Sequence, residues 1–183
     1  MMPVSSRRHD LDWLRIAAVF LLIPYHSSRI FDTWEAFYVK NAETSVGLTG
    51  IRALLDPWGM PLLFVIAGAA TWLALRRRTG VQYLGERVVR LVIPLLVGVV
   101  VLIPPQAYLA WLGQGHRGSF GQFLGPYWAM QTGEPMGFTG GFTVGHLWFV
   151  LFLFVFSVVA LPVFLFLMRP AANRAVRWLA GSR

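Results

Sequence analysis

Four apolar segments dominate this chain of 183 residues and constrain its fold more than any other feature. They run over residues 11–31, 58–75, 91–112 and 147–168, and each is close to the ~20 residues that cross a bilayer as a helix. Hydrophobic residues make up 56% of the chain and charged residues only 13%, which is too little polar sequence to cover four such segments in water. The sequence therefore predicts an all-α membrane protein with four transmembrane helices in a single domain, residues 1–183.

Basic residues predict how this protein is oriented. Cytoplasmic loops of membrane proteins carry an excess of Lys and Arg, so the net charge of +8 needs no nucleic acid as a partner. With a cytoplasmic N-terminus, four basic residues lie outside (Arg29, Lys40, Arg52 and Arg117) and twelve lie inside: Arg7, Arg8, Arg15, Arg76, Arg77, Arg78, Arg87, Arg90, Arg169, Arg174, Arg177 and Arg183. We expect both termini to be cytoplasmic, the first segment to be an uncleaved span, and membrane lipids to surround a multi-pass protein.

The first apolar segment carries two ionisable residues on one helix face. Arg15 and His26 are 11 residues apart, which places them ~20° apart around a helix and ~16 Å apart along it. Burying such groups in lipid is costly, so they usually face the interior of a bundle. One interpretation is that Arg15 reaches the headgroups and His26 bonds a neighbouring carbonyl. The other, which we favour for the two together, is a polar stripe that lines a pocket.

Two further pairs are candidates for binding. Arg87 and Arg90 are three residues apart at the start of the third segment, so they project from one helix side and suit phosphate groups. On spacing alone, however, ordinary cytoplasmic anchoring is the favoured explanation. His146 and Trp148 open the fourth segment. Between these segments, residues 113–145 are rich in glycine and carry Phe120, Phe123, Tyr127, Trp128, Phe138 and Phe142. They suit either a flexible interfacial loop or a partly re-entrant one that stacks on sugars. The absence of cysteine excludes disulfides and thiolate chemistry.

Together these residues resemble the acyltransferase-3 family of integral membrane acyltransferases, which includes members that modify glucans. The family's R-x10-H pattern is matched by Arg15 and His26, its R-x-x-R by Arg87 and Arg90, and its H-L-W-F by residues 146–149. Its F-x-x-S-G-F-like motif is matched by "FVIAGA", residues 64–69, with Ala67 in place of the small hydroxyl residue. Four motifs in the family's order cover nearly the whole chain.

The resemblance implies a bundle of about ten helices, of which this chain holds the first part. The remaining helices or another copy would then be partners. It also implies an O-acyltransferase in a bacterial inner membrane that moves an acyl group from cytoplasmic acyl-CoA, such as acetyl-CoA or succinyl-CoA, to a hydroxyl of an envelope glycan or a lipid-linked acceptor, with no metal.

By the same resemblance, Arg87 and Arg90 bind the donor's phosphates, Arg15 orients the donor and His26 is the catalytic group. We expect His146 and Trp148 to bind the acceptor substrate, with His146 helping to position it. His26 suits either general-base or nucleophilic catalysis, because a neutral imidazole can do both near neutral pH. A transporter or proton-relay subunit is the alternative, since that class also holds His and Arg inside the membrane. A non-catalytic scaffold is the third possibility.

Overall fold

The computed structural model describes residues 9–34, 37–129, 140–169 and 181, and in this part of the chain it contains helices and no strands. The all-α prediction is therefore confirmed for the described residues. Phe138 and five of the arginines used for the orientation (Arg7, Arg8, Arg174, Arg177 and Arg183) lie outside them. The helices are α1 (His9–Ser28), α2 (Val46–Leu75), α3 (Gly80–Arg87), η1 (Val88–Val92), α4 (Ile93–Val101), α5 (Ile103–Gly113), α6 (Phe120–Trp128), η2 (Gly145–Leu147) and α7 (Trp148–Leu167).

Three helical stretches among the described residues are long and apolar enough to cross a membrane: Val46–Leu75, Gly80–Gly113 and Gly145–Leu167. They contain the second, third and fourth predicted spans except for Met168, where α7 has just ended. The first predicted span corresponds to α1, which has 20 residues but is not among the three. Its first two turns carry Asp10, Asp12 and Arg15, which lower its mean hydropathy. Passage of α1 through the bilayer and the cytoplasmic position of both termini remain predictions.

Helix α2 begins twelve residues before the predicted span, at Val46 rather than at residue 58. The side chain of Ser45 caps it by accepting a hydrogen bond from the Leu48 N–H, which satisfies one of the free donors of a helix start. The helix has 30 residues and is therefore ~45 Å long, whereas the hydrocarbon core of a bilayer measures ~30 Å. Its first turns can therefore stand outside the hydrocarbon and carry charge.

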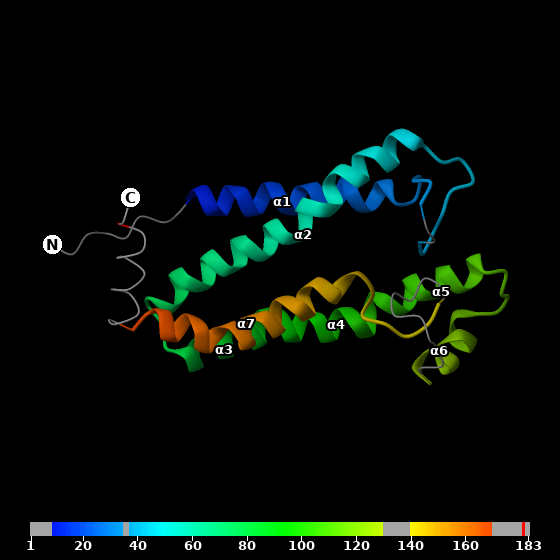
Figure 1. The fold of residues 1–183 in the computed structure, drawn as a ribbon. Helices are drawn as coiled ribbons and strands as arrows, with labels where there is room; N and C mark the ends of the chain where they lie inside the picture. The colour runs from blue at the N-terminus through cyan, green and yellow to red at the C-terminus, as the bar shows by residue number, and fades with distance from the viewer. Residues whose placement is uncertain (1–8, 35–36, 130–139, 170–180, 182–183) are drawn as a thin grey trace.

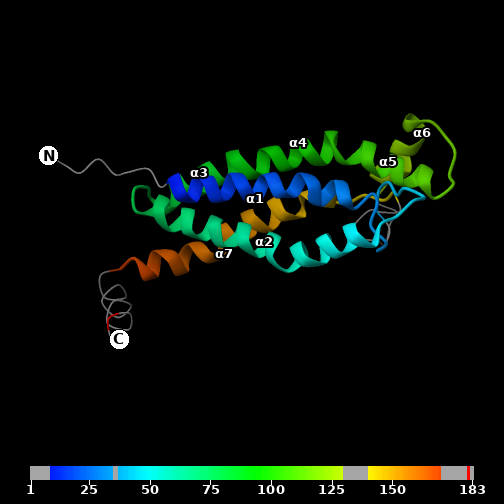
Figure 2. The ribbon, with the colours of Figure 1, turned by 90° about the horizontal axis from the view of Figure 1, so that it is seen from above.

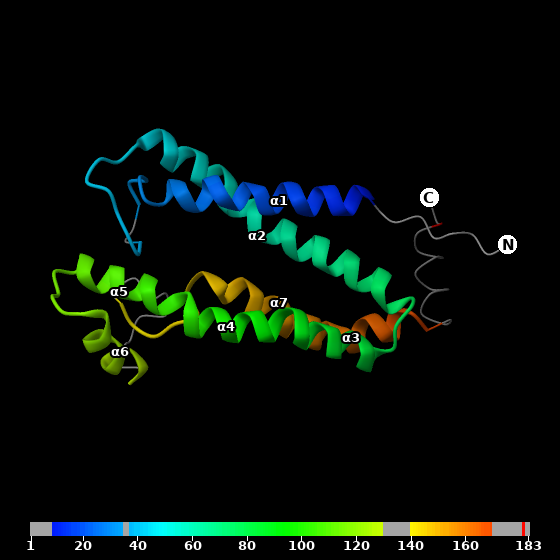
Figure 3. The ribbon, with the colours of Figure 1, turned by 180° about the vertical axis from the view of Figure 1, so that it is seen from behind.

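The helices form two layers (Figures 1 and 3). One layer holds α1 and α2, with α2 crossing α1 obliquely, and the other holds α3, α4 and α7. Helix α1 begins and α7 ends at the same end of the bundle, next to α3, while α5 and α6 lie at the opposite end, as Figure 2 also shows from above. Small apolar clusters join the elements: Ala18, Leu63 and Ile66 between α1 and α2, and Leu75, Tyr83 and Leu161 at the α3 end.

The glycine-rich segment of residues 113–145 contains a short helix, α6, that neither sequence interpretation predicted. Ser119 and Gln122 form a reciprocal capping box that starts α6. Phe123 and Tyr127 of α6 are buried against Ile103 and Ala107 of α5. Amphipathic spacing of the aromatic residues thus gives this part of the segment a packed apolar face rather than a loop conformation.

The helix of the third span widens at η1, where the Ile93 N–H donates to the Val88 carbonyl in a π-turn. Pro94 follows directly, and it lacks the N–H that an α-helix would donate to the Arg90 carbonyl. Farther along, Pro104 and Pro105 occupy the first turn of α5, where proline is tolerated. The helix of the third span is therefore divided close to these two prolines, between α4 and α5.

Candidate functional site

A cavity of about 340 Å³ lies between α1, α2, α3 and α7, and it collects all three arginines that the sequence predicted for the site. Arg15 from α1, Arg87 from α3 and Arg90 from η1 all line it. Arg78 and Glu86 line it as well. The remaining wall is largely apolar and comes from α1, α2, α3 and α7: Val19, Leu63, Ile66, Ala67, Ala70, Ala74, Tyr83, Phe149 and Leu153. Side chains far apart in the sequence thus share one cationic cavity.

Arg87 is held in place by its neighbours on α2 and α3. Its Nη2 donates to the Thr71 Oγ1 at 3.1 Å, and its guanidinium lies 4.9 Å from the centre of the Tyr83 ring. The Thr71 hydroxyl donates to the Ala67 carbonyl, so the Tyr83 hydroxyl, 2.8 Å from Thr71 Oγ1, donates to Thr71. Ala67 lacks the hydroxyl of the family motif, and Thr71, one turn later, places a hydroxyl beside the cavity arginine.

Glu86 lies between two of the cavity arginines. Its Oε2 is 2.5 Å from the Arg78 Nη1 and 3.9 Å from the Arg90 Nη2. Arg90 is four residues after Glu86, a spacing that brings opposite charges together on a helix. The Arg90 side chain is nevertheless 70% exposed, so it is far less fixed than Arg87.

The two predicted histidines face each other farther along the bundle. The rings of His26 and His146 are 6.5 Å apart, edge to face. His26 Nδ1 is 2.8 Å from the Leu22 carbonyl; because a carbonyl only accepts, Nδ1 carries the hydrogen, and the neutral ring has its lone pair on Nε2. A bond from His26 to a carbonyl was one interpretation of the sequence, and it leaves Nε2 available. His146 Nδ1 lies 3.1 Å from Gln106 Oε1.

Helix spacing relates the histidines to the cavity. Arg15 and Val19 line the cavity, and His26 follows Arg15 by 11 residues on nearly the same side of α1, ~16 Å farther along. On α7, Phe149 and Leu153 line the cavity, and His146 is one turn before Phe149. Trp148 is placed differently, since its ring contacts are with Phe149 and Phe152 of its own helix.

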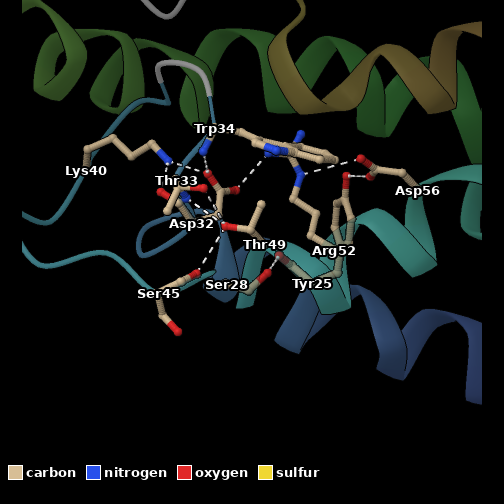
Figure 4. Close-up of polar contacts among 10 residues, drawn as sticks. All are labelled: Tyr25, Ser28, Asp32, Thr33, Trp34, Lys40, Ser45, Thr49, Arg52 and Asp56. Carbon is tan, nitrogen blue, oxygen red and sulfur yellow. Dashed lines mark hydrogen bonds and ion pairs between the residues drawn. The ribbon is translucent and has the colours of Figure 1, made fainter. Parts of the chain in front are cut away.

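A buried ionic network lies beyond the histidines, where the segment after α1 meets the first turns of α2 (Figure 4). The Asp32 side chain is completely buried and binds Arg52 Nη1 at 2.7 Å and Lys40 Nζ at 2.5 Å. Arg52 Nε is 3.6 Å from Asp56. The Tyr25 hydroxyl donates to Asp56, and the Tyr25 ring contacts that of His26. The network thus runs from Tyr25, the neighbour of His26, to Lys40 in the segment between α1 and α2.

Two opposing effects act on the Asp32 carboxyl. Burial alone would raise its pKa, but hydrogen bonds from Lys40, Arg52 and the Trp34 N–H outweigh burial and hold the pKa below its ordinary value. Asp32 is therefore a carboxylate at neutral pH, and it compensates a guanidinium that is itself almost completely buried.

Several residues of these sites were not predicted from the sequence: Asp32, Arg52, Thr71, Arg78, Glu86 and Gln106. Thr71 and Gln106 could have been noticed as isolated polar residues inside apolar segments. Arg78 and Glu86 are indistinguishable in sequence from other charges at a membrane surface. No three histidine or carboxylate side chains gather closely enough to hold a metal ion within the ranges that the structure describes.

The fold and the site of the described residues define a class: a helical membrane protein with a cationic cavity at one end and two neighbouring imidazoles farther along. A family model described as an acyltransferase domain matches residues 8–182, and the chain therefore belongs to the acyltransferase-3 family. It is similar to the glucans biosynthesis protein C of Escherichia coli K12, with 28% identity over 166 residues, which are 90% of this chain and 41% of that protein. The corresponding protein of E. coli O6:K15:H31 strain 536 is 28% identical over 165 residues, with the same shares. This chain thus spans 41% of the length of these curated relatives. No solved structure matches it.

Proposed function

We propose that this chain binds the acyl-CoA donor of a membrane-bound O-acyltransferase and carries its catalytic histidine. The observation that carries this proposal is the convergence of Arg15, Arg87 and Arg90 on one cavity. Guanidinium groups recognise phosphates through paired hydrogen bonds, and acyl-CoA presents phosphates at one end of a long flexible arm. The apolar wall suits that arm better than it suits a freely hydrated anion.

His26 is the group that acts on the acceptor in this proposal. Its Nε2 takes the proton of the attacking hydroxyl, the new ester C–O bond forms, the C–S bond breaks, and the thiolate leaves. In the nucleophilic variant, Nε2 first attacks the thioester carbonyl, the C–S bond breaks and the thiolate leaves. The acceptor hydroxyl then attacks the acyl group, the C–N bond breaks and Nε2 takes up the hydroxyl proton. Both routes need a lone pair on Nε2, and the bond from Nδ1 to the Leu22 carbonyl supports that tautomer. His146 faces the same ring and positions the acceptor.

Orientation and acceptor belong to the same proposal. The arginine end faces the cytoplasm, α1 crosses the membrane as a fourth span, and the acceptor arrives from the side of α5 and α6. The name of the relatives, glucans biosynthesis protein C, favours a hydroxyl of an envelope glycan as the acceptor, and acetyl-CoA or succinyl-CoA as the donor to try first.

Labelled acetyl-CoA and succinyl-CoA, supplied to inverted membrane vesicles that contain the full-length protein and glucan, test this function. We expect His26→Ala to lower transfer by at least ~100-fold, the usual scale for loss of a catalytic base. His116→Ala is the matched control, because His116 is an exposed histidine stacked on Trp111, and it should keep near-normal transfer. Unchanged transfer by His26→Ala would overturn the proposal. An activity that follows an ion gradient without acyl-CoA would replace it with the transport alternative.

A further inference from the structure

One arginine of the "RRR" run at residues 76–78 differs from the other two. Arg76 lies 5.8 Å from the Trp72 ring of α2, and Arg77 is exposed and does not line the cavity. Arg78 does line it and is paired with Glu86. All three side chains are exposed, that of Arg78 by 39%, so Arg78 differs from its neighbours by lining the cavity and by its pairing with Glu86.

Glu86 brings guanidinium groups from two elements to one point. Arg78 comes from the connection after α2 and Arg90 from η1, and both approach the same carboxylate oxygen, at 2.5 and 3.9 Å. A carboxylate that two guanidiniums share has the geometry of a phosphate contact, with fewer oxygens and less charge. In this cavity, which also holds Arg15 and Arg87, Glu86 is the only acidic side chain among the lining residues that the structure describes.

We propose, resting on the proposed function, that Arg78 is a further phosphate ligand of the acyl-CoA donor and that Glu86 is its resident counter-ion. Without donor, the Glu86 carboxylate holds Arg78 and Arg90 over the cavity and limits their repulsion. A phosphate group of the donor outcompetes the carboxylate and takes over both guanidiniums. Glu86 therefore lowers the affinity for every anion, because each anion has to displace its carboxylate. Smaller or less charged anions then compete poorly with the donor.

Binding of CoA to the full chain in nanodiscs of phosphatidylcholine measures this directly. Arg78→Ala should weaken CoA binding about tenfold, a reduced value for a charge-assisted contact because the side chain is partly exposed. Arg77→Ala, from the same run of arginines, should stay within about twofold of the wild type. Glu86→Gln should tighten binding by about three- to tenfold, since the ligand no longer displaces a carboxylate. That gain should shrink in the Arg78→Ala background, where one of the two competing contacts is already gone.

Three results would overturn the inference. The first is Arg78→Ala binding CoA as well as Arg77→Ala does, and the second is Glu86→Gln weakening the binding. The third is that Arg78 binds the phosphate of an anionic lipid headgroup instead. In nanodiscs that contain phosphatidylglycerol, the wild type would then bind this lipid and Arg78→Ala would not, while both would bind CoA with the same affinity. If neither the wild type nor any variant binds CoA, the proposed function itself fails. If the wild type binds CoA and only Arg87→Ala weakens the binding, the role of Arg78 fails while the proposed function stands.

Discussion

Replacing Asp32 with asparagine would leave the Arg52 guanidinium buried beside a neutral amide. Only 9% of the Arg52 side chain and none of Asp32 is exposed, so water cannot compensate the lost charge. Removing one partner of a buried ion pair costs about 3–5 kcal/mol. Asp56, 3.6 Å from Arg52 Nε, and the remaining amide oxygen offset part of this cost, and we expect a loss of about 3 kcal/mol, or roughly 150-fold in the unfolding equilibrium.

Unfolding by SDS in mixed micelles, followed by circular dichroism and tryptophan fluorescence, measures this change. Trp34, whose ring lies 4.6 Å from the Arg52 guanidinium, contributes to the fluorescence from within the network. Glu43→Gln is the matched control because Glu43 is exposed, and it should change the stability by less than ~0.5 kcal/mol. Replacing both partners, Asp32→Ala with Arg52→Met, should cost less than the sum of the single changes.

The pH dependence should have a definite sign. The pKa of Asp32 is lower in the folded protein than in the unfolded chain, so the unfolded chain takes up the proton first as the pH falls. The stabilisation by Asp32 is fully present above the ordinary aspartate pKa of about 3.9 and is lost as the pH falls through the lower, folded value. The difference between wild type and Asp32→Asn should therefore shrink below about pH 4. If Asp32→Asn costs no more stability than Glu43→Gln at neutral pH, the network does not stabilise the fold.

Two further substitutions test the packing and the cavity. Gly140→Ala should destabilise the protein by about 2–3 kcal/mol in the same titration, because Gly140 has φ +92° and an added Cβ would lie 2.7 Å from the Trp111 Cβ and 3.0 Å from the Ala107 carbonyl oxygen. Gly113→Ala is the control and should be nearly neutral, because an added Cβ there would meet no neighbouring group within 4 Å. Equal losses of stability in the two variants would contradict the packing. Thr71→Val should weaken CoA binding about tenfold by removing the hydroxyl that holds Arg87, whereas Thr71→Ser should bind normally, and identical behaviour of the two variants would show that the hydroxyl is not needed.

The sequence predicted the helical class and the residues of the cationic cavity better than it predicted element boundaries. Apolar length is a local property, so three of the four segments could be located directly. The start of α2 could not, because residues 46–57 carry Arg52 and Asp56, and charged residues inside a membrane helix look like a loop. Arg52 is compensated there by Asp32, 20 residues earlier, and by Asp56, and the first of these contacts cannot be read from the local sequence.

The candidate site shows the same division. Arg15 and His26, or Arg87 and Arg90, are related by helix spacing and by family motif, so each pair was visible in the sequence. Whether these pairs share one cavity depends on how the two helix layers pack, and the periodicity of the sequence does not show how they pack. Arg78 illustrates the limit, since its two neighbours have the same side chain and only the fold turns Arg78 alone toward the cavity.

The π-turn at Val88–Val92 accommodates one residue more than an α-helical path would, and so offsets whatever precedes it by about 100° around the axis. Deleting a single residue there would hardly shorten the apolar stretch, yet it would swing the arginine-bearing start of the helix away from the side on which the donor is proposed to bind. A change of one residue in this helix thus matters little for its length but much for the direction of its side chains. Insertions or deletions should therefore be far more harmful at this turn than substitutions of its valines.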